Sequence, residues 1–388
     1  MVSIRGKIVT PTDVIDGYVL VDGGRIIDVS QVKPVDLKIC DFGEALILPG
    51  FIDLHTHGLG KYEPLDTESL IGMAKLEPQY GTTALLPTGA AMSSSQYVNL
   101  GDCARQAIEA VGSDGARILG VHLEGPFINP KSSGAMALST RRPITQSESR
   151  FYVEQIGDLL KIMTFSPELE GGVELIKYLR KHGIVAALGH SVAEGAQCAE
   201  FVAAGLSHVV HMFNAFVPSG EKEQGVLKAG LIEHLLVNEA LTCEFICDMQ
   251  HVAPEFIKIA SKVLGTARFV AITDSVYGAG LADGIYAFPN GGQYRIAGRV
   301  ARLVGGEWAG CLAGSVLTMN RAFGNLIEYC DIDLVTAAKY TSGNAARVIG
   351  VDHETGSIET GKRADIAVLD DDYQCLATFI GGNLVYQK

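Results

Sequence analysis

The sequence predicts an α/β fold, a (β/α)8 barrel of the TIM type with a small β-sandwich domain built from both chain ends. Eight short apolar runs alternate with longer segments that have helical spacing. Both ends of the chain are instead short runs of alternating apolar and polar residues, separated by Gly and Asp. Parallel strands joined by helices produce the first pattern, and antiparallel strands joined by turns produce the second. We therefore expect a small β domain over 1–46 plus 350–388 and a barrel over 47–349.

The predicted elements follow one another in the order that such a fold needs. The N-terminal segment, including GYVLVDGGRIIDVS, has the alternation of antiparallel strands. The eight barrel strands are predicted at 47–57, 82–88, 117–125, 162–168, 183–191, 206–214, 241–249 and 268–275. After the eighth strand, residues 283–307 predict β-hairpins and residues 312–330 predict a helix.

The segments between the predicted strands have the apolar spacing of amphipathic helices. The segment 251–265 is one example, and it ends at a Gly, the residue that commonly terminates a helix. Its buried face is predicted to consist of Phe256, Ile259, Ala260 and Val263.

Composition limits the class of protein. The chain has 388 residues, 47% of them hydrophobic, which is enough for a large core. Its net charge is −13 at pH 7, and a surface of this sign repels phosphate backbones and anionic lipids, so we expect neither nucleic acid nor a membrane as partner. The eight cysteines form no C-x-x-C pair, and the first residues lack the apolar stretch of an export signal. These features favour a cytoplasmic protein with reduced thiols.

Histidines and an acid gather at the C-terminal ends of the predicted strands. His55 and His57 end the first, Glu124 the third, His190 the fifth and His211 the sixth. In a barrel these ends form one rim, where the active site is built. A lone His in an apolar strand is usually a core residue, but four with a Glu, all at strand ends, favour a zinc or iron(II) site. The other histidines are interpreted as structural or exposed: His122, His182, His208, His234 and His353.

Two further residues are candidates for catalysis. Asp274 ends the eighth strand, where a carboxylate could take a proton from a metal-bound water and pass it to a leaving group. The alternative is a helix N-cap, which Asp-Ser after a strand often provides. His251 follows the seventh strand and could hydrogen-bond a carbonyl oxygen as it becomes an oxyanion, or it could simply open the next helix. The sequence has no G-x-S-x-G elbow, complete P-loop or dinucleotide fingerprint.

These residues lie in motifs that resemble the N-acetylglucosamine-6-phosphate deacetylases of the amidohydrolase superfamily. The resemblance covers nearly the whole chain, and its most specific part is the order HLEGPF, GHS, HMFNA and TDS. It implies that Glu124, His190 and His211 hold a divalent metal ion. It also implies that His55 and His57 keep a second ion possible. Zinc is favoured, with iron, manganese or cobalt as alternatives.

The resemblance implies hydrolysis of the N-acetyl amide of an amino-sugar phosphate, which converts N-acetylglucosamine 6-phosphate to glucosamine 6-phosphate and acetate. A metal-bound hydroxide would attack, Asp274 would act as general base and then acid, and His251 would contact the substrate near its carbonyl. A homodimer is implied, because in this family an Arg that binds the 6-phosphate often comes from the neighbouring subunit. Further substrate contacts are implied for Asn214, Ala215, Cys311, Leu312 and Ala313.

Two positions depart from the family pattern. The family usually has G-A-H after HLEGPF, whereas this chain has Ala135 followed by Met136. The family's R-E-P-G, which supplies the phosphate-binding Arg, is KEQG here, with Lys222 in place of that Arg. Lys keeps the charge but not the bidentate fork. The alternatives are therefore an amidohydrolase that deacylates a different N-acyl hexosamine or another amide and, in a different class, a non-catalytic binding protein.

Overall fold

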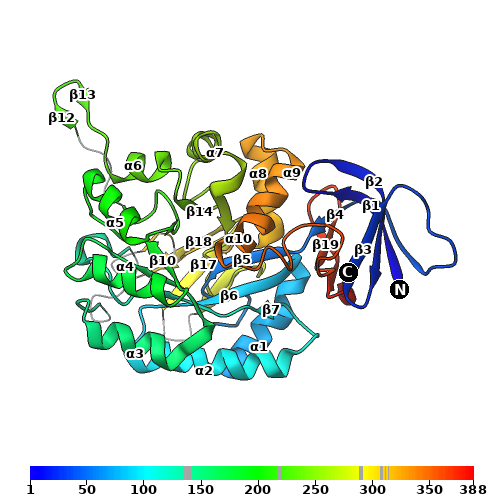
Figure 1. The fold of residues 1–388 in the computed structure, drawn as a ribbon, viewed down its shortest axis with the longest axis horizontal. Helices are drawn as coiled ribbons and strands as arrows, with labels where there is room; N and C mark the ends of the chain where they lie inside the picture. Colours follow the sequence, from blue (N-terminus) through cyan, green and yellow to red (C-terminus); the bar gives the residue numbers. More distant parts are fainter. Residues whose placement is uncertain are drawn as a thin grey trace.

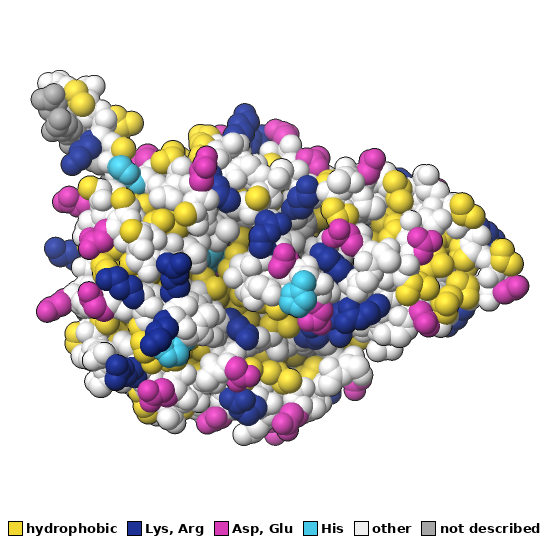
Figure 2. Space-filling model, in the orientation of Figure 1, with side chains coloured by type: hydrophobic (Ala, Val, Ile, Leu, Met, Phe, Trp, Pro, Cys, Tyr) yellow, Lys and Arg dark blue, Asp and Glu magenta, His cyan; other side chains and the backbone are white. Residues whose placement is uncertain are grey.

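The computed structural model of the chain describes residues 1–134, 136, 141–216, 221–287, 292–305, 309–310, 312 and 314–388, except for the side chains of 221–223. The described chain forms a large α/β body with a separate sheet at one end (Figure 1). The predicted fold class is confirmed. Charged side chains of both signs are scattered over the face shown in Figure 2.

The separate sheet is built from both ends of the chain, and the two termini lie in it close together (Figure 1). Its central strand β4 (Ile39–Pro49) pairs in parallel with β1 (Val2–Val9) and antiparallel with β19 (Ile366–Leu369). The seven strands have the order β21-β20-β19-β4-β1-β2-β3. The others are β2 (Val14–Asp22), β3 (Arg25–Ser30), β20 (Cys375–Ile380) and β21 (Asn383–Gln387). The domain limits at 46/47 and 349/350 stay a prediction.

Eight parallel strands form the barrel, and each predicted run overlaps one of them. They are β5 (Phe51–Thr56), β6 (Thr82–Ala90), β8 (Val121–Glu124), β9 (Leu160–Phe165), β10 (Val185–Leu188), β11 (His208–Val209), β14 (Thr242–Ile246) and β15 (Phe269–Ile272). A short strand, β7 (Arg117–Ile118), pairs with β6. The first and last strands are joined by the Asp274 N–H, which donates to the His55 carbonyl at 2.9 Å, and by a parallel bridge between Thr56 and Ser275. This seam places Asp274 beside His55.

Helices surround the barrel (Figure 1). Their starts follow ordinary capping chemistry: Asp66 accepts the Ser69 N–H at the start of α1, and Ser93 forms a capping box with Gln96 at the start of α2. None of the described helices is long and apolar enough to cross a membrane. The helices are α1 (Thr67–Leu76), α2 (Ser94–Val111), α3 (Gln146–Ile156), α4 (Gly172–Lys181), α5 (Cys198–Ala204), α6 (Leu231–Val237), α7 (Pro254–Arg268), α8 (Met319–Cys330), α9 (Leu334–Ala338) and α10 (Asn344–Val348).

Helix α7 buries a different face from the one predicted. Ile257, Ala260 and Leu264 face the core, so only Ala260 of the predicted stripe is buried. The exposed fractions of Phe256, Ile259 and Val263 are 53, 54 and 41%. Two neighbouring apolar stripes have the same helical spacing, and the pattern alone does not select the one that meets the barrel.

Two segments outside the barrel form antiparallel β structure. β16 (Gly284–Ala287), β17 (Gln293–Ala297) and β18 (Val300–Val304) form a three-stranded sheet, as predicted for 283–307. β12 (Glu221–Glu223) and β13 (Val226–Leu227) pair as a hairpin that projects from the body (Figure 1).

Candidate metal and active site

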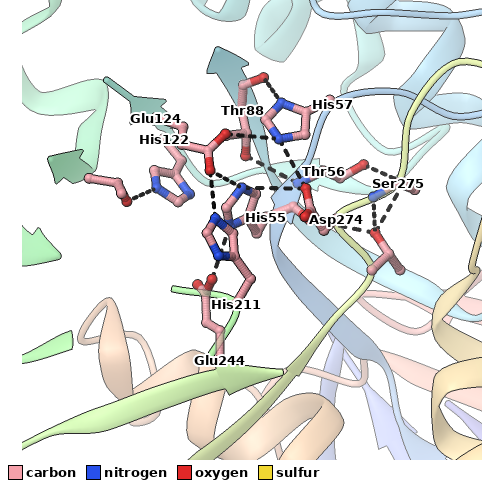
Figure 3. A network of polar contacts seen from close by, with 12 residues as sticks. His55, Thr56, His57, Thr88, His122, Glu124, His211, Glu244, Asp274 and Ser275 are labelled. Carbon is pink, nitrogen blue, oxygen red and sulfur yellow. Dashed lines mark hydrogen bonds and ion pairs between the residues drawn. The ribbon is translucent and has the colours of Figure 1, made fainter. Parts of the chain in front are cut away.

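The six residues predicted at strand ends converge on one rim of the barrel, and five of them are labelled in Figure 3. Glu124, the last residue of β8, is at the centre. Its Oε1 lies 3.0 Å from Nε2 of His190 and 2.8 Å from Nε2 of His211. Its Oε2 lies 3.3 Å from Nε2 of His57. One buried carboxylate therefore faces histidines from three other loops or strands.

His55 carries a buried nitrogen that lacks a hydrogen bond. Its side chain is fully buried, and Nε2 lies 3.6 Å from Glu124 Oε1 and 3.6 Å from Asp274 Oδ1. These distances are too long for hydrogen bonds, and Nε2 finds no other partner among the described residues. A buried polar atom without a partner is costly, so it indicates a missing ligand. A cation between the two carboxylates and this nitrogen fits the arrangement.

The ligand atoms lie close enough together for metal binding. His55, Glu124 and His211 place one donor atom each within 4.8 Å of the others, and so do His55, His57 and Asp274. Imidazole and carboxylate donors of this kind suit a divalent transition metal. The donor set is therefore that of a divalent-metal site.

Three of the histidines are oriented by hydrogen bonds at Nδ1, the ring nitrogen that points away from Glu124. His57, His190 and His211 each direct Nδ1 at a backbone carbonyl. The carbonyls belong to Thr88, Ser132 and Asn214, at 3.0, 3.0 and 3.2 Å. A carbonyl only accepts, so each Nδ1 carries a proton, and Nε2 is the nitrogen that faces the site and can present a lone pair to a cation once it has lost its own proton.

The charges of the site stabilise one another. Burial acts to raise the pKa of Glu124, but His55 and two further histidines outweigh it and hold that pKa well below its usual range. Burial also acts to raise the pKa of Asp274, and His55 and His57 outweigh it and lower that pKa. Burial lowers the pKa of His57, yet its hydrogen bonds to the two carboxylates raise it to about 9. Both carboxylates are thus ionised at neutral pH, the form that binds a cation.

Three site residues have a strained backbone. His190, His211 and Asp274 have φ values of 51, 28 and 47°, in the left-handed region that non-glycine residues rarely adopt. Such conformations cost about 1–3 kcal/mol each and gather at functional sites. The three residues each lie two positions after the end of a strand, β10, β11 or β15, and the turn at each one directs a side chain into the site. A turn follows Asp274 instead of a helix, which removes the N-cap alternative.

His251 lies in the loop after β14, where it is held by an acid. Its Nδ1 is 2.6 Å from Asp248 Oδ2, and its backbone N–H donates to Asp248 Oδ1. Burial lowers the pKa of His251, but Asp248 outweighs it and raises that pKa, with a further contribution from Asp274. Asn214 Nδ2 donates to the His251 carbonyl at 3.2 Å. The loops after β11 and β14 are thereby tied together beside Asp274.

Two of the predicted substrate contacts lie next to the ligands. Asn214 and Ala215 follow His211 by three and four residues, and the Ala215 carbonyl accepts a hydrogen bond from the Ser132 hydroxyl. Met136 is in the same loop as Ser132, and its carbonyl accepts from Arg141 at 2.9 Å.

For the other predicted substrate contacts, the structure describes only part of the residues or none of them. Leu312 forms a bridge with Arg302 of β18. Lys222 lies in β12 on the projecting hairpin, and its side chain is outside the described residues. Ala135, Cys311 and Ala313 also lie outside the described residues. Their roles toward a substrate stay predictions.

The sequence analysis missed Glu244. This residue is fully buried in β14, and burial acts to raise its pKa, but His208 and His55 outweigh it and lower that pKa. The available signal was a single acid inside the apolar run LTCEFICDM, because an acid rarely occupies a buried strand without a partner. His122 and His208, read from the sequence as structural or exposed, are fully buried beside this group.

Comparisons with known proteins agree with this geometry. The model of the amidohydrolase family matches residues 46–385. The chain is 34% identical to the N-acetylglucosamine-6-phosphate deacetylase of Bacillus subtilis (strain 168), over 98% of this chain and 95% of that protein. It is 29% identical to the N-acetylgalactosamine-6-phosphate deacetylase of Escherichia coli O157:H7, over 93% of each. A mutant N-acetyl-D-glucosamine-6-phosphate deacetylase from Mycobacterium smegmatis, solved in complex with N-acetyl-D-glucosamine-6-phosphate, is similar at a TM-score of 0.89 and 26% identity, over 100% of this chain and 99% of that one.

Proposed function

We propose that the substrate is N-acetylglucosamine 6-phosphate, because the chain belongs to the N-acetylglucosamine-6-phosphate deacetylase family of the amidohydrolase superfamily. The members of this family are hydrolases that act on linear amides. The products are glucosamine 6-phosphate and acetate. The observation that carries the proposal is the unpartnered Nε2 of His55 between the carboxylates of Glu124 and Asp274. That arrangement supplies both a place for a cation and a base beside it.

Glu124, His190 and His211 are proposed to hold one divalent ion, and His55 and His57 are available to hold a second. When bound, such an ion polarises an amide carbonyl and lowers the pKa of a water molecule. Zinc suits this donor set, and iron, manganese or cobalt are alternatives.

Asp274 is proposed as the general base and acid. Its side chain is 22% exposed while Glu124 is 5% exposed, so Asp274 can reach an entering substrate as well as the ligands. Its lowered pKa keeps it a carboxylate at neutral pH, the form that accepts a proton from the attacking water. The same proton is then donated to the amine nitrogen as the amide C–N bond breaks.

His251 is proposed to stabilise the carbonyl oxygen. Asp248 accepts the Nδ1 proton and raises the pKa of the ring, so that in the imidazolium form Nε2 also carries a proton, which it donates as negative charge builds on that oxygen. Asn214 supports a substrate site next to it, because its Oδ1 is buried without a hydrogen-bond partner among the described residues. A hydroxyl or amide N–H of the sugar would satisfy this oxygen.

The test is acetate release from a set of matched sugars. N-acetylglucosamine 6-phosphate, its galactosamine counterpart and unphosphorylated N-acetylglucosamine are offered to chelator-treated enzyme resupplied with zinc, iron(II), manganese or cobalt. We expect the first sugar to have the highest kcat/KM. No turnover of any of them with any of the metals would refute the proposal.

A second candidate, deacylation of a different N-acyl hexosamine, is favoured by Met136 and Lys222. We also propose that the protein is a homodimer, because Lys222 lies on a hairpin that projects away from its own barrel and is free to meet a second copy (Figure 1). If the wild type strongly prefers the 6-phosphate and Lys222→Ala abolishes that preference, the second candidate is rejected.

A further inference from the structure

We propose that Glu244 is a positioning residue that sets the orientation and the proton of His55 so that this ring can bind metal. The proposal rests on the metal site proposed above. Glu244 Oε2 lies 2.9 Å from Nδ1 of His55 (Figure 3). Glu244 Oε1 lies 2.9 Å from Nε2 of His208. All three side chains are fully buried. One carboxylate therefore links a rim ligand to a histidine deeper in the barrel.

The contact determines which nitrogen of His55 can act as a ligand. An ionised carboxylate only accepts hydrogen bonds, so Nδ1 of His55 carries the proton. In the neutral ring the lone pair is then on Nε2, the atom that lies unpartnered between Glu124 and Asp274. Without Glu244, nothing else among the described residues holds Nδ1.

His55 differs in this respect from the other predicted histidine ligands. His57, His190 and His211 direct Nδ1 at neutral backbone carbonyls. His55 directs Nδ1 at a carboxylate, which makes the imidazole a stronger electron donor to a metal. The charged partner of Nδ1 therefore distinguishes His55 from the other three rings.

Glu244 is itself held in place from the opposite side. His208 Nδ1 lies 2.6 Å from the Thr242 hydroxyl oxygen, and that hydroxyl donates to the Ser207 carbonyl at 3.1 Å. Thr242 and Glu244 are on the same strand, two residues apart, so His208 spans from one to the other. This chain of contacts prevents the carboxylate from rotating away from His55.

A purely structural role would have different consequences. It would alter the stability of the metal-free protein and leave metal affinity unchanged. Glu77 provides the matched control, because it is also a buried Glu, 4% exposed, but makes no described contact with the ligand residues.

The experiment compares Glu244→Gln with Glu77→Gln. Zinc affinity is measured by competition with a chromophoric chelator, and the unfolding temperature is measured in EDTA. We expect zinc binding to weaken by about 10- to 100-fold in Glu244→Gln and to be unchanged in Glu77→Gln. Zinc affinity within twofold of wild type in Glu244→Gln overturns the proposal, whatever happens to the unfolding temperature. Wild type that binds no divalent ion overturns the proposed function as well, so the two failures are distinguishable.

A spectroscopic readout tests the orientation directly. In zinc-loaded protein with 15N-labelled histidine, we expect the His55 ring to show a proton on Nδ1 that is strongly shifted downfield by the carboxylate. The same shift retained in Glu244→Gln contradicts the proposal. Should that variant fail to fold, Glu244→Asp keeps the charge but withdraws the carboxylate by one methylene. We expect at least tenfold weaker zinc binding there, and unchanged binding contradicts the proposal.

Discussion

Two clusters of charged residues in this molecule, both at least partly buried, pair their carboxylates with different side chains. At the junction of the barrel with the end sheet, Arg117 lies 3.1 Å from Glu354 and 3.0 Å from Asp365. At the rim of the barrel, Glu124 and Asp274 face histidines instead. A guanidinium offers only donors and is always charged, so it balances the junction carboxylates without a bound ion. An imidazole can instead lose a proton and present a lone pair, so the rim can exchange its protons for a metal cation, as proposed above.

The difference separates residues that hold the fold from residues that serve the reaction. Changes at the rim are expected to affect metal binding and turnover more than stability. Changes at the junction are expected to do the opposite. Asp274 and Glu124 test the rim, Asp365 tests the junction, and Glu77 is a buried acid outside both; the expected effects decrease in the order given below.

Asp274→Asn removes the proton acceptor and has the largest expected effect. We expect kcat to fall by about 10²- to 10⁴-fold, because general acid and base catalysis is lost while the shape is kept. Steady-state acetate release measures the effect, and unfolding in urea serves as the control. A variant that keeps a tenth or more of the wild-type kcat would show that another group moves the proton.

Asp365→Asn breaks the junction. Its side chain is fully buried and also accepts from Thr355 at 3.0 Å and from the Gly381 N–H at 2.8 Å. Arg117 then keeps only Glu354 as its partner, and the free energy of unfolding is expected to fall by about 3 kcal/mol, the low end for a broken buried ion pair. Urea denaturation monitored by circular dichroism measures it. The kcat/KM of the folded fraction is expected to stay within twofold, and a large loss of turnover would argue against the separation of roles.

Comparing the metal-free and the zinc-loaded protein tests whether the rim binds the ion. Adding zinc at about 100 times its dissociation constant is expected to stabilise the metal-free protein by about 2.7 kcal/mol. The gain should appear in wild type and in Asp365→Asn, and it should be much smaller in Glu124→Gln, which loses the central ligand. Thermal unfolding with and without EDTA measures it. Equal stabilisation of Glu124→Gln would place the ion elsewhere.

Glu77 is a buried acid without an ion-pair partner among the described residues, and it has the smallest expected effect. Burial, with a contribution from Asp53, raises the pKa of Glu77 to about 8. The folded protein therefore keeps this proton at a pH where the unfolded chain has lost it. The stabilisation is fully present below about pH 4.5 and is lost as the pH rises through about 8. Wild type should lose at most about 1.4 kcal/mol per pH unit in this window, and Glu77→Gln should flatten the slope. Parallel slopes for both proteins would contradict the assignment.

Much of the rim was predictable because the C-terminal ends of barrel strands meet at one place wherever the strands lie in the sequence. That rule alone groups His55, Glu124 and Asp274. It says nothing about contacts in the barrel interior, which depend on strand tilt and stagger. Glu244, 189 residues from His55, was therefore missed.

The surface of α7 was mispredicted for a related reason. Its two apolar stripes have the same spacing in the sequence. Only the packing of the helix against the barrel buries Ile257 and leaves Phe256 exposed. The role of Lys222 stays a prediction, since its side chain lies outside the described residues.

The seam of the barrel determines the order in which the residues of the site come together during synthesis. Thr56 and Ser275, whose hydroxyls lie 2.9 Å apart, are separated by 219 residues, and the neighbouring Asp274 donates its N–H to His55 across the same seam. A growing chain can thus carry His55, Glu124, His190 and His211 long before it carries a base. We therefore expect a chain truncated before Asp274 to lack turnover, because it lacks both the proposed base and the seam that holds it beside His55.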